Sequence, residues 1–312
     1  MQDLSRRAML VSVTIKLEGL LGERRDRGAS ELVENHYLVA SRRAKDSKYL
    51  IDRKHPKVKA VIAAAQQVRA VMYRYTFPWG DSNLRLLPVK AHDEFKHALD
   101  KALDDLKDCQ EQYLQVYPML VKMSESDLGG LFDKNEYPHV DRVRTMFKAS
   151  TGYWPMPEGG HFVADIAALA AKEARETIEH DNAVRTSQAI NELIARVEQT
   201  VTIFVDKLAA YRKDEATNKS YGIFRDSLVS NVKDMARLIR TLNFTDAPEL
   251  NDLAKHVERL GAYSAEALRD NEYVRAIMVT DGQSLLARLD GLRKTDVEID
   301  GMIDAVSDYT NI

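Results

Sequence analysis

Apolar positions recur at helical spacing along one stretch, from Val163 to Lys213, that contains neither proline nor glycine. Its first half is rich in alanine and glutamate, which are good helix formers. In its second half the apolar residues follow at alternating steps of four and three: Ile190, Ile194, Val197, Val201, Phe204, Leu208 and Tyr211. This a/d rhythm predicts a helix of about 50 residues, roughly 75 Å long, with one seam facing a partner.

A second stripe with the same rhythm begins near Lys90 and predicts a helix to about residue 120. Its members are Phe95, Leu99, Ala102, Leu106, Cys109, Tyr113, Val116 and Leu120. Two such helices in one chain are natural partners for each other. The pattern therefore predicts a mainly α protein whose spine is a long antiparallel helical hairpin or bundle.

Shorter patterns predict a small β element near one end of this hairpin. Residues 11–17 alternate apolar and polar side chains, which indicates a strand, and residues 147–154 are its expected partner. The charged segment 22–28 is expected to be a loop. Pro56 suits the first turn of a helix over 56–75, and glycines and prolines make 124–162 the irregular part.

The C-terminal third predicts a helical subdomain of its own. A polar break near 214–222 separates it, so the expected domains are 1–214, with the hairpin and the β element, and 222–312. Apolar spacing predicts one helix from about Phe224 to Leu242. A second is expected to be capped by the segment Asp246-Ala247-Pro248-Glu249, with further short helices over 263–311.

Composition narrows the class of protein. The 312 residues are 45% hydrophobic and 30% charged, which is typical of a folded globular or helical chain. The single cysteine, Cys109, excludes an internal disulfide and fits a reducing compartment such as the cytoplasm. No apolar run of about 18 residues is present, so no membrane span is expected.

Positive charge is concentrated in the first part of the chain, and its densest run is 42–59. Such a run could neutralise phosphates of a nucleic acid, and the aromatic side chains over 73–79 could stack on bases. The alternative is that the cations pair with acidic side chains and that the aromatic residues belong to the core. The candidate phosphate-binding residues are Arg42, Arg43, Lys45, Lys48, Arg53, Lys54, Lys57 and Lys59, and the candidate stacking residues are Tyr73, Tyr75, Phe77 and Trp79.

Sequence motifs for catalysis are absent: the chain has no phosphate-binding P-loop, no dinucleotide-binding glycine motif and no Cys-x-x-Cys. Glu94-x-x-His97 lies on the predicted second helix, whereas di-iron bundles carry this motif on two helices and add two further glutamates. We therefore predict no catalytic residue, metal or cofactor. A remaining enzyme hypothesis is a site assembled from the irregular segment, using His139, Asp141, Tyr153, Glu158 and His161.

A series of short motifs between about residues 10 and 213 resembles a phage-encoded family of largely helical proteins that is classed as a domain of unknown function. The motifs are Arg85-Leu86-Leu87-Pro88, Tyr117-Pro118, Leu128-Gly129-Gly130-Leu131-Phe132, Tyr137-Pro138, Phe147 and Pro155-Met156-Pro157. The resemblance carries no catalytic residue. It implies a phage or prophage origin, the bacterial host cytoplasm during infection, and a genetic neighbourhood that includes an AAA+ ATPase.

The leading functional prediction is a non-enzymatic interaction or scaffold protein of phage origin that assembles through helical, coiled-coil-like faces. Its expected partner is a second copy of itself or another protein, with an AAA+ ATPase as the candidate, because this chain lacks a nucleotide site of its own. The alternative prediction is a nucleic-acid-binding protein that uses the basic N-terminal region.

Overall fold

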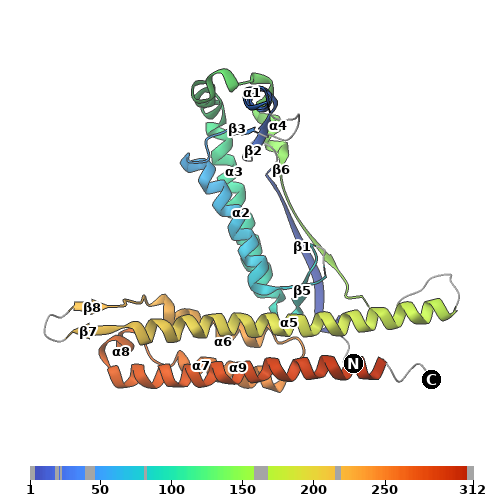
Figure 1. The fold of residues 1–312 in the computed structure, drawn as a ribbon, viewed down its shortest axis with the longest axis vertical. Coiled ribbons are helices and arrows are strands. Elements are labelled where there is room, and N and C mark those ends of the chain that lie inside the picture. Colours follow the sequence, from blue (N-terminus) through green and yellow to red (C-terminus); the bar gives the residue numbers. More distant parts are fainter. Residues whose placement is uncertain are drawn as a thin grey trace. The chain divides into compact units, whose positions relative to one another are not determined.

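The computed structural model describes residues 4–17, 21, 23–38, 46–80, 83–157, 168–214 and 219–307, most of them helical (Figure 1). Contacts divide the chain into two compact units, each assembled from separate segments. Unit 1 comprises Met1–Leu10, Tyr75–Ala91 and Trp154–Ile312, and unit 2 comprises Val11–Arg74 and His92–Tyr153. The mainly α class is confirmed. The contacts group the chain differently from the expected domains, because the boundary predicted near 214–222 falls inside unit 1.

The spine of unit 1 is α5 (Ala168–Ala210), a helix of 43 residues. The apolar stripe predicted on it is buried from Ile194 to Tyr211, and Ile190 is half-buried. α5 packs chiefly along α9 (Glu272–Ser307) and α6 (Ser227–Leu242) (Figure 1). The partner that covers the seam is thus in the C-terminal part of the chain, whereas the predicted partner helix, α3 (His92–Leu128), belongs to unit 2.

α5 and α9 run antiparallel, because residues later in α9 contact residues earlier in the α5 segment. The Arg275 guanidinium lies 5.0 Å from the centre of the Tyr211 ring, and Gly282 lies beside Val205. The prediction of short helices over 263–311 is wrong for most of this segment, because α9 is a single helix of 36 residues. Gly282 does not interrupt it, since its missing side chain is what lets the two backbones approach.

The rest of unit 1 closes around this pair. α7 (Pro248–Leu260) packs on α6 and α9, the short α8 (Ala265–Asp270) precedes α9, and β7 (Arg212–Asp214) pairs antiparallel with β8 (Lys219–Tyr221). β4 (Phe77–Pro78) pairs antiparallel with β5 (Arg85–Pro88), which neighbours β1 (Ala8–Leu17) in the same sheet. Two short 3-10 segments, Leu4–Arg6 and Val89–Ala91, flank these strands.

Unit 2 is built on α2 (Pro56–Tyr75) and α3, whose apolar stripe is buried at Phe95, Leu99, Ala102, Leu106, Tyr113 and Leu120. α3 continues past Pro118 to Leu128, further than predicted. β6 (Phe147–Trp154) neighbours β1 in the sheet, so the predicted pairing of these two segments is confirmed. The unit also holds α4 (Val140–Met146) and the 3-10 segments Gly129–Leu131 and Lys134–Glu136.

The segment expected to be a charged loop forms part of a β-hairpin in unit 2. β2 (Glu23–Asp26) pairs antiparallel with β3 (Asp46–Tyr49), and α1 (Arg27–Tyr37) packs on β3. The Asp26 side chain begins α1 by accepting a hydrogen bond from the Ala29 N–H at 2.9 Å. Lys48, the first described cation of the predicted basic run, lies on this hairpin.

Candidate functional site

The predicted basic run does not form one continuous surface in the described structure. Arg42, Arg43 and Lys45 lie outside the described residues. Lys48 is on β3, Arg53 and Lys54 are in the turn before α2, and Lys57 and Lys59 are in its first turn. The five described members therefore have to be judged one at a time.

Lys48 is enclosed by acidic groups of unit 2. Its ammonium lies 2.9 Å from Asp26 Oδ2 and 2.8 Å from Glu136 Oε2, it also donates to the Leu131 carbonyl, and its side chain is only 8% exposed. Desolvation works against the charged form, but the hydrogen bonds to Glu136 and Asp26 outweigh it and raise the pKa of Lys48. The hydrogen bond from Ala29 and then that from Lys48 lower the pKa of Asp26. Lys48 is accordingly a structural cation that anchors the hairpin.

Three of the other described cations remain at the surface. Arg53, Lys54 and Lys59 are exposed, whereas half-buried Lys57 donates to Gln112 Oε1 at 2.8 Å. Arg53 lies over the ring of Tyr49, with 5.2 Å from its guanidinium carbon to the ring centre. Electrostatic attraction of this kind holds an arginine over an aromatic face while leaving its N–H groups open to water.

Most of the aromatic residues predicted to stack on bases are in the core of unit 1. Tyr75, Phe77 and Trp79 are buried, and only Tyr73 of this group is exposed. Arg196 lies 5.1 Å from the centre of the Phe77 ring, and Arg185 lies 5.7 Å from that of Trp79. Both arginines belong to α5, and their contacts with these rings hold the β4 segment against that helix. The stacking role predicted for the three buried aromatic residues is therefore wrong.

Of the five residues in the enzyme hypothesis the structure describes three, and all three are exposed. His139 and Asp141 have largely exposed side chains, and the histidine Nδ1 accepts a hydrogen bond from the Asp141 N–H at 3.4 Å at the start of α4. Tyr153 is exposed, and Glu158 and His161 lie outside the described residues. Within the part of the chain that the structure describes, no group of three or more His, Cys, Asp and Glu side chains could hold a metal ion.

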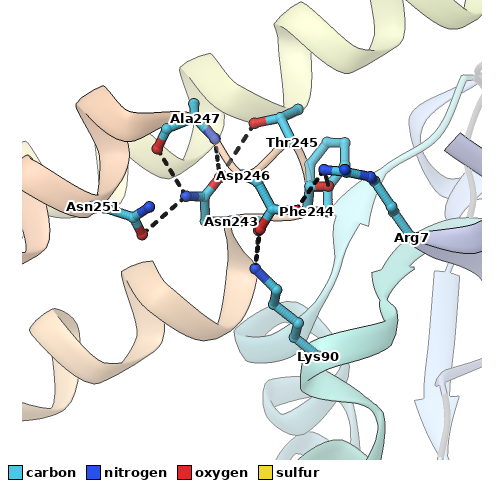
Figure 2. A network of polar contacts seen from close by, with 8 residues as sticks. All are labelled: Arg7, Lys90, Asn243, Phe244, Thr245, Asp246, Ala247 and Asn251. Carbon is cyan, nitrogen blue, oxygen red and sulfur yellow. Dashed lines mark hydrogen bonds and ion pairs between the residues drawn. The ribbon is translucent and has the colours of Figure 1, made fainter. Parts of the chain in front are cut away.

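A polar network at the corner between α6 and α7 is the feature of unit 1 that the sequence did not indicate (Figure 2). Asp246 adopts a left-handed backbone with φ 57°, which is uncommon for a residue with a side chain. Its carboxylate accepts from Arg7 Nη1 at 2.6 Å and also binds Lys90. The segment expected to precede α7 does begin it, with Ala247 at the N-cap position and Pro248 as the first helical residue. The Ala247 N–H donates to Asn243 Oδ1 at 3.1 Å.

Asp246 thus joins three segments that are far apart in sequence: the N-terminus, the segment that leads into α3, and the α6–α7 corner. The hydrogen bond from Lys90, reinforced by the charges of Lys90 and Arg7, holds the pKa of Asp246 below its ordinary value of 3.8. These ion pairs and hydrogen bonds hold the three segments together, so we assign the network to stability.

Replacing Asp246 with Asn tests this assignment, because asparagine tolerates the left-handed backbone while removing the charge. A carboxylate whose pKa is lowered by folding stabilises the protein above its unfolded pKa and ceases to do so as the pH falls through the folded value. We expect the variant to melt below the wild type at pH 7, and the gap to narrow as the pH falls below the ordinary carboxyl pKa of 3.8. Asp206→Asn serves as the control, because Asp206 is exposed on α5. An Asp246→Asn protein that melts at the same temperature as the wild type at pH 7 contradicts the assignment.

Comparisons with protein families, with curated proteins and with solved structures find no match to this chain. None of the helices in the described residues combines the length and the apolar character needed to cross a lipid bilayer.

Proposed function

We propose that this protein is a non-enzymatic interaction protein that associates with a second copy of itself through α1. The observation that supports the proposal is that α1 buries a serine and exposes its large apolar residues. Leu32 and Tyr37 are each 70% exposed, and Leu38, which ends the helix, is 92% exposed. Exposed apolar side chains that gather on one short element are typical of interaction sites.

The way in which α1 is attached explains this orientation. Ser30, the buried residue of the helix, donates from Oγ to the Asp26 carbonyl at 2.6 Å and accepts from the Asp46 N–H at 2.9 Å. The bond from the Asp46 N–H holds Ser30 against β3, and Ala29 and Val33 of the helix are half-buried. Leu32 and Tyr37 are left in water although the helix is amphipathic, so its apolar residues are available to a partner.

Charge favours a second copy as that partner. α1 carries Arg27 in its first turn and Glu31 and Glu34 further along. Two copies of α1 packed antiparallel about a two-fold axis bring the arginine of each near the glutamates of the other, with Leu32 close to the axis. An interface formed by one helix of 11 residues from each copy is small and belongs to the weak, transient class. We therefore expect a dissociation constant in the micromolar range or above.

The coiled-coil seams are a less suitable route to assembly than the sequence suggested. The α5 seam is buried by helices of its own unit, and the α3 stripe is buried within unit 2. The AAA+ ATPase implied by the family resemblance stays a proposal for a second kind of partner, and the bacterial cytoplasm during infection stays the proposed location. We propose the exposed residues of α1 as the contact surface for a second copy and for such a partner.

Light scattering coupled to gel filtration tests the self-association. We expect the average mass of the wild type to rise with concentration, and the double variant Leu32→Glu, Leu38→Glu to stay monomeric over the same range. Ile203→Glu is the matched control, because Ile203 is an exposed isoleucine on α5, and it should behave as the wild type does. A wild type that is monomeric at every concentration, or a double variant that associates equally, contradicts the proposal.

A further inference from the structure

The outer face of the β2–β3 hairpin is a separate surface with a different chemistry. The register places Glu23 opposite Tyr49, Arg24 opposite Lys48 and Arg25 opposite Ser47. Because side chains alternate along a strand, Arg24 and Lys48 share one face, and Glu23, Arg25, Ser47 and Tyr49 share the other. The hydrogen bond from Ser47 Oγ to Glu23 Oε1 is consistent with this assignment.

The two faces of the hairpin carry different residues. On the first face the Lys48 side chain is buried by its ion pairs with Asp26 and Glu136, whereas Arg24 is exposed. On the second face Arg25 is exposed, and Tyr49 is 42% exposed although it is a large aromatic residue. The anchoring of Lys48, which removes it from any phosphate, is thus what presents Tyr49 and Arg25 to solvent.

Tyr49 is extended by a cation at its ring. The Arg53 guanidinium lies over the ring at 5.2 Å, and exposed Lys54 follows it in the turn. A planar aromatic ring with a planar guanidinium on it offers two surfaces on which a nucleobase can stack. Two exposed carboxylates lie nearby and reduce the net positive charge of this face: Glu23, which accepts from Ser47 Oγ, and Asp52, which accepts the Lys54 N–H at 2.8 Å.

We propose that this face, defined by Arg25, Tyr49, Arg53 and Lys54, binds single-stranded nucleic acid by stacking one or two bases on Tyr49 and Arg53 while the cations contact the adjoining phosphates. Single strands are favoured over duplex because stacking on a tyrosine requires an unpaired base. The proposal is independent of the association through α1, since none of these four residues belongs to that helix.

The charges also set the expected salt dependence. Three cations that each neutralise one phosphate of a single strand give a slope of about −2 for the logarithm of the binding constant against the logarithm of salt concentration. Affinity should therefore fall steadily with salt but keep a stacking contribution. A purely ionic surface would bind any polyanion, whereas this one should prefer a chain that carries bases.

Fluorescence anisotropy of the full chain with labelled 12-nucleotide oligothymidylate and oligouridylate tests the proposal. We expect both strands to bind more tightly than a 12-base-pair duplex or inorganic polyphosphate, and the difference between the two strands to show whether DNA or RNA is preferred. Tyr49→Ala should weaken binding about tenfold, and Tyr49→Phe should retain it. Arg25→Ala and Arg53→Ala should each reduce the salt slope by about 0.7.

Matched controls come from exposed residues of the same types elsewhere. Tyr273→Ala on α9 and Arg142→Ala on α4 should leave the affinity unchanged. Circular dichroism of each variant shows whether it has folded, and the retained binding of Tyr49→Phe guards against a purely structural effect. Polyphosphate binding as tight as that of the oligonucleotides, equal binding by Tyr49→Ala, or no binding at low salt overturns the proposal.

Discussion

Replacing Gly282 with leucine is expected to lower the free energy of unfolding by about 3 kcal/mol. A Cβ at this position would lie 2.4 Å from Val205 Cγ2 and 3.8 Å from Val201 Cγ1 of α5. Valine is branched at Cβ and cannot swing its methyl groups aside, so α5 and α9 would have to separate. Chemical denaturation followed by circular dichroism measures the effect, because both helices contribute strongly to the signal.

A smaller substitution, Gly282→Ala, tests the same contact, because its effect on stability should change sign with the residue at position 205. Gly282→Ala alone should be destabilising, because the clash exceeds the gain of about 1 kcal/mol that alanine brings to a helix interior. In a Val205→Ala background the obstructing methyl is gone, and Gly282→Ala should then be stabilising. Gly28→Ala in α1, where the nearest atom is Asp26 Oδ1 at 3.6 Å, should not destabilise. A Gly282→Ala variant more stable than the wild type shows that the helices do not approach as described.

The same glycine shows where reasoning from the sequence stops. The steps of four and three identified α5 and α3 and most of the residues that they bury. Such a stripe says that one side of a helix is covered, but it does not say by which helix. The partner of α5 depends on α9, where Gly282 resembles a break in the sequence and becomes a point of close packing only beside Val205.

The surfaces of unit 2 were hidden from the sequence for a related reason. β2 does not alternate apolar and polar residues, because all four of its residues are charged. Its pairing with β3 is stabilised instead by the ion pairs of Lys48 with Asp26 and with Glu136, which is far away in the sequence. The basic run was visible as charge, but charge alone could not separate the buried Lys48 from the exposed Arg53.

Replacing Asn243 with leucine is expected to lower the free energy of unfolding by about 3 kcal/mol, because it breaks the centre of the network at the α6–α7 corner (Figure 2). The residue is fully buried. Its Oδ1 accepts from the Ala247 N–H at 3.1 Å and from Thr245 Oγ1 at 3.2 Å, and its Nδ2 donates to the Ala247 carbonyl at 3.0 Å and to Asn251 Oδ1 at 3.2 Å. Leucine has a similar size but can make none of these four hydrogen bonds.

The energetic reason is an asymmetry in hydrogen bonding. A bond made in the folded protein replaces a bond to water and contributes about 1 kcal/mol, whereas a buried group left without a partner loses its full hydration. Asn251→Leu is the control, because Asn251 is exposed and gives up only one bond of the network, so its effect should stay within about 1 kcal/mol. Equal losses for the two variants in denaturation experiments would show that Asn243 does not organise the corner, and that Arg7 and Lys90 hold it through Asp246 alone.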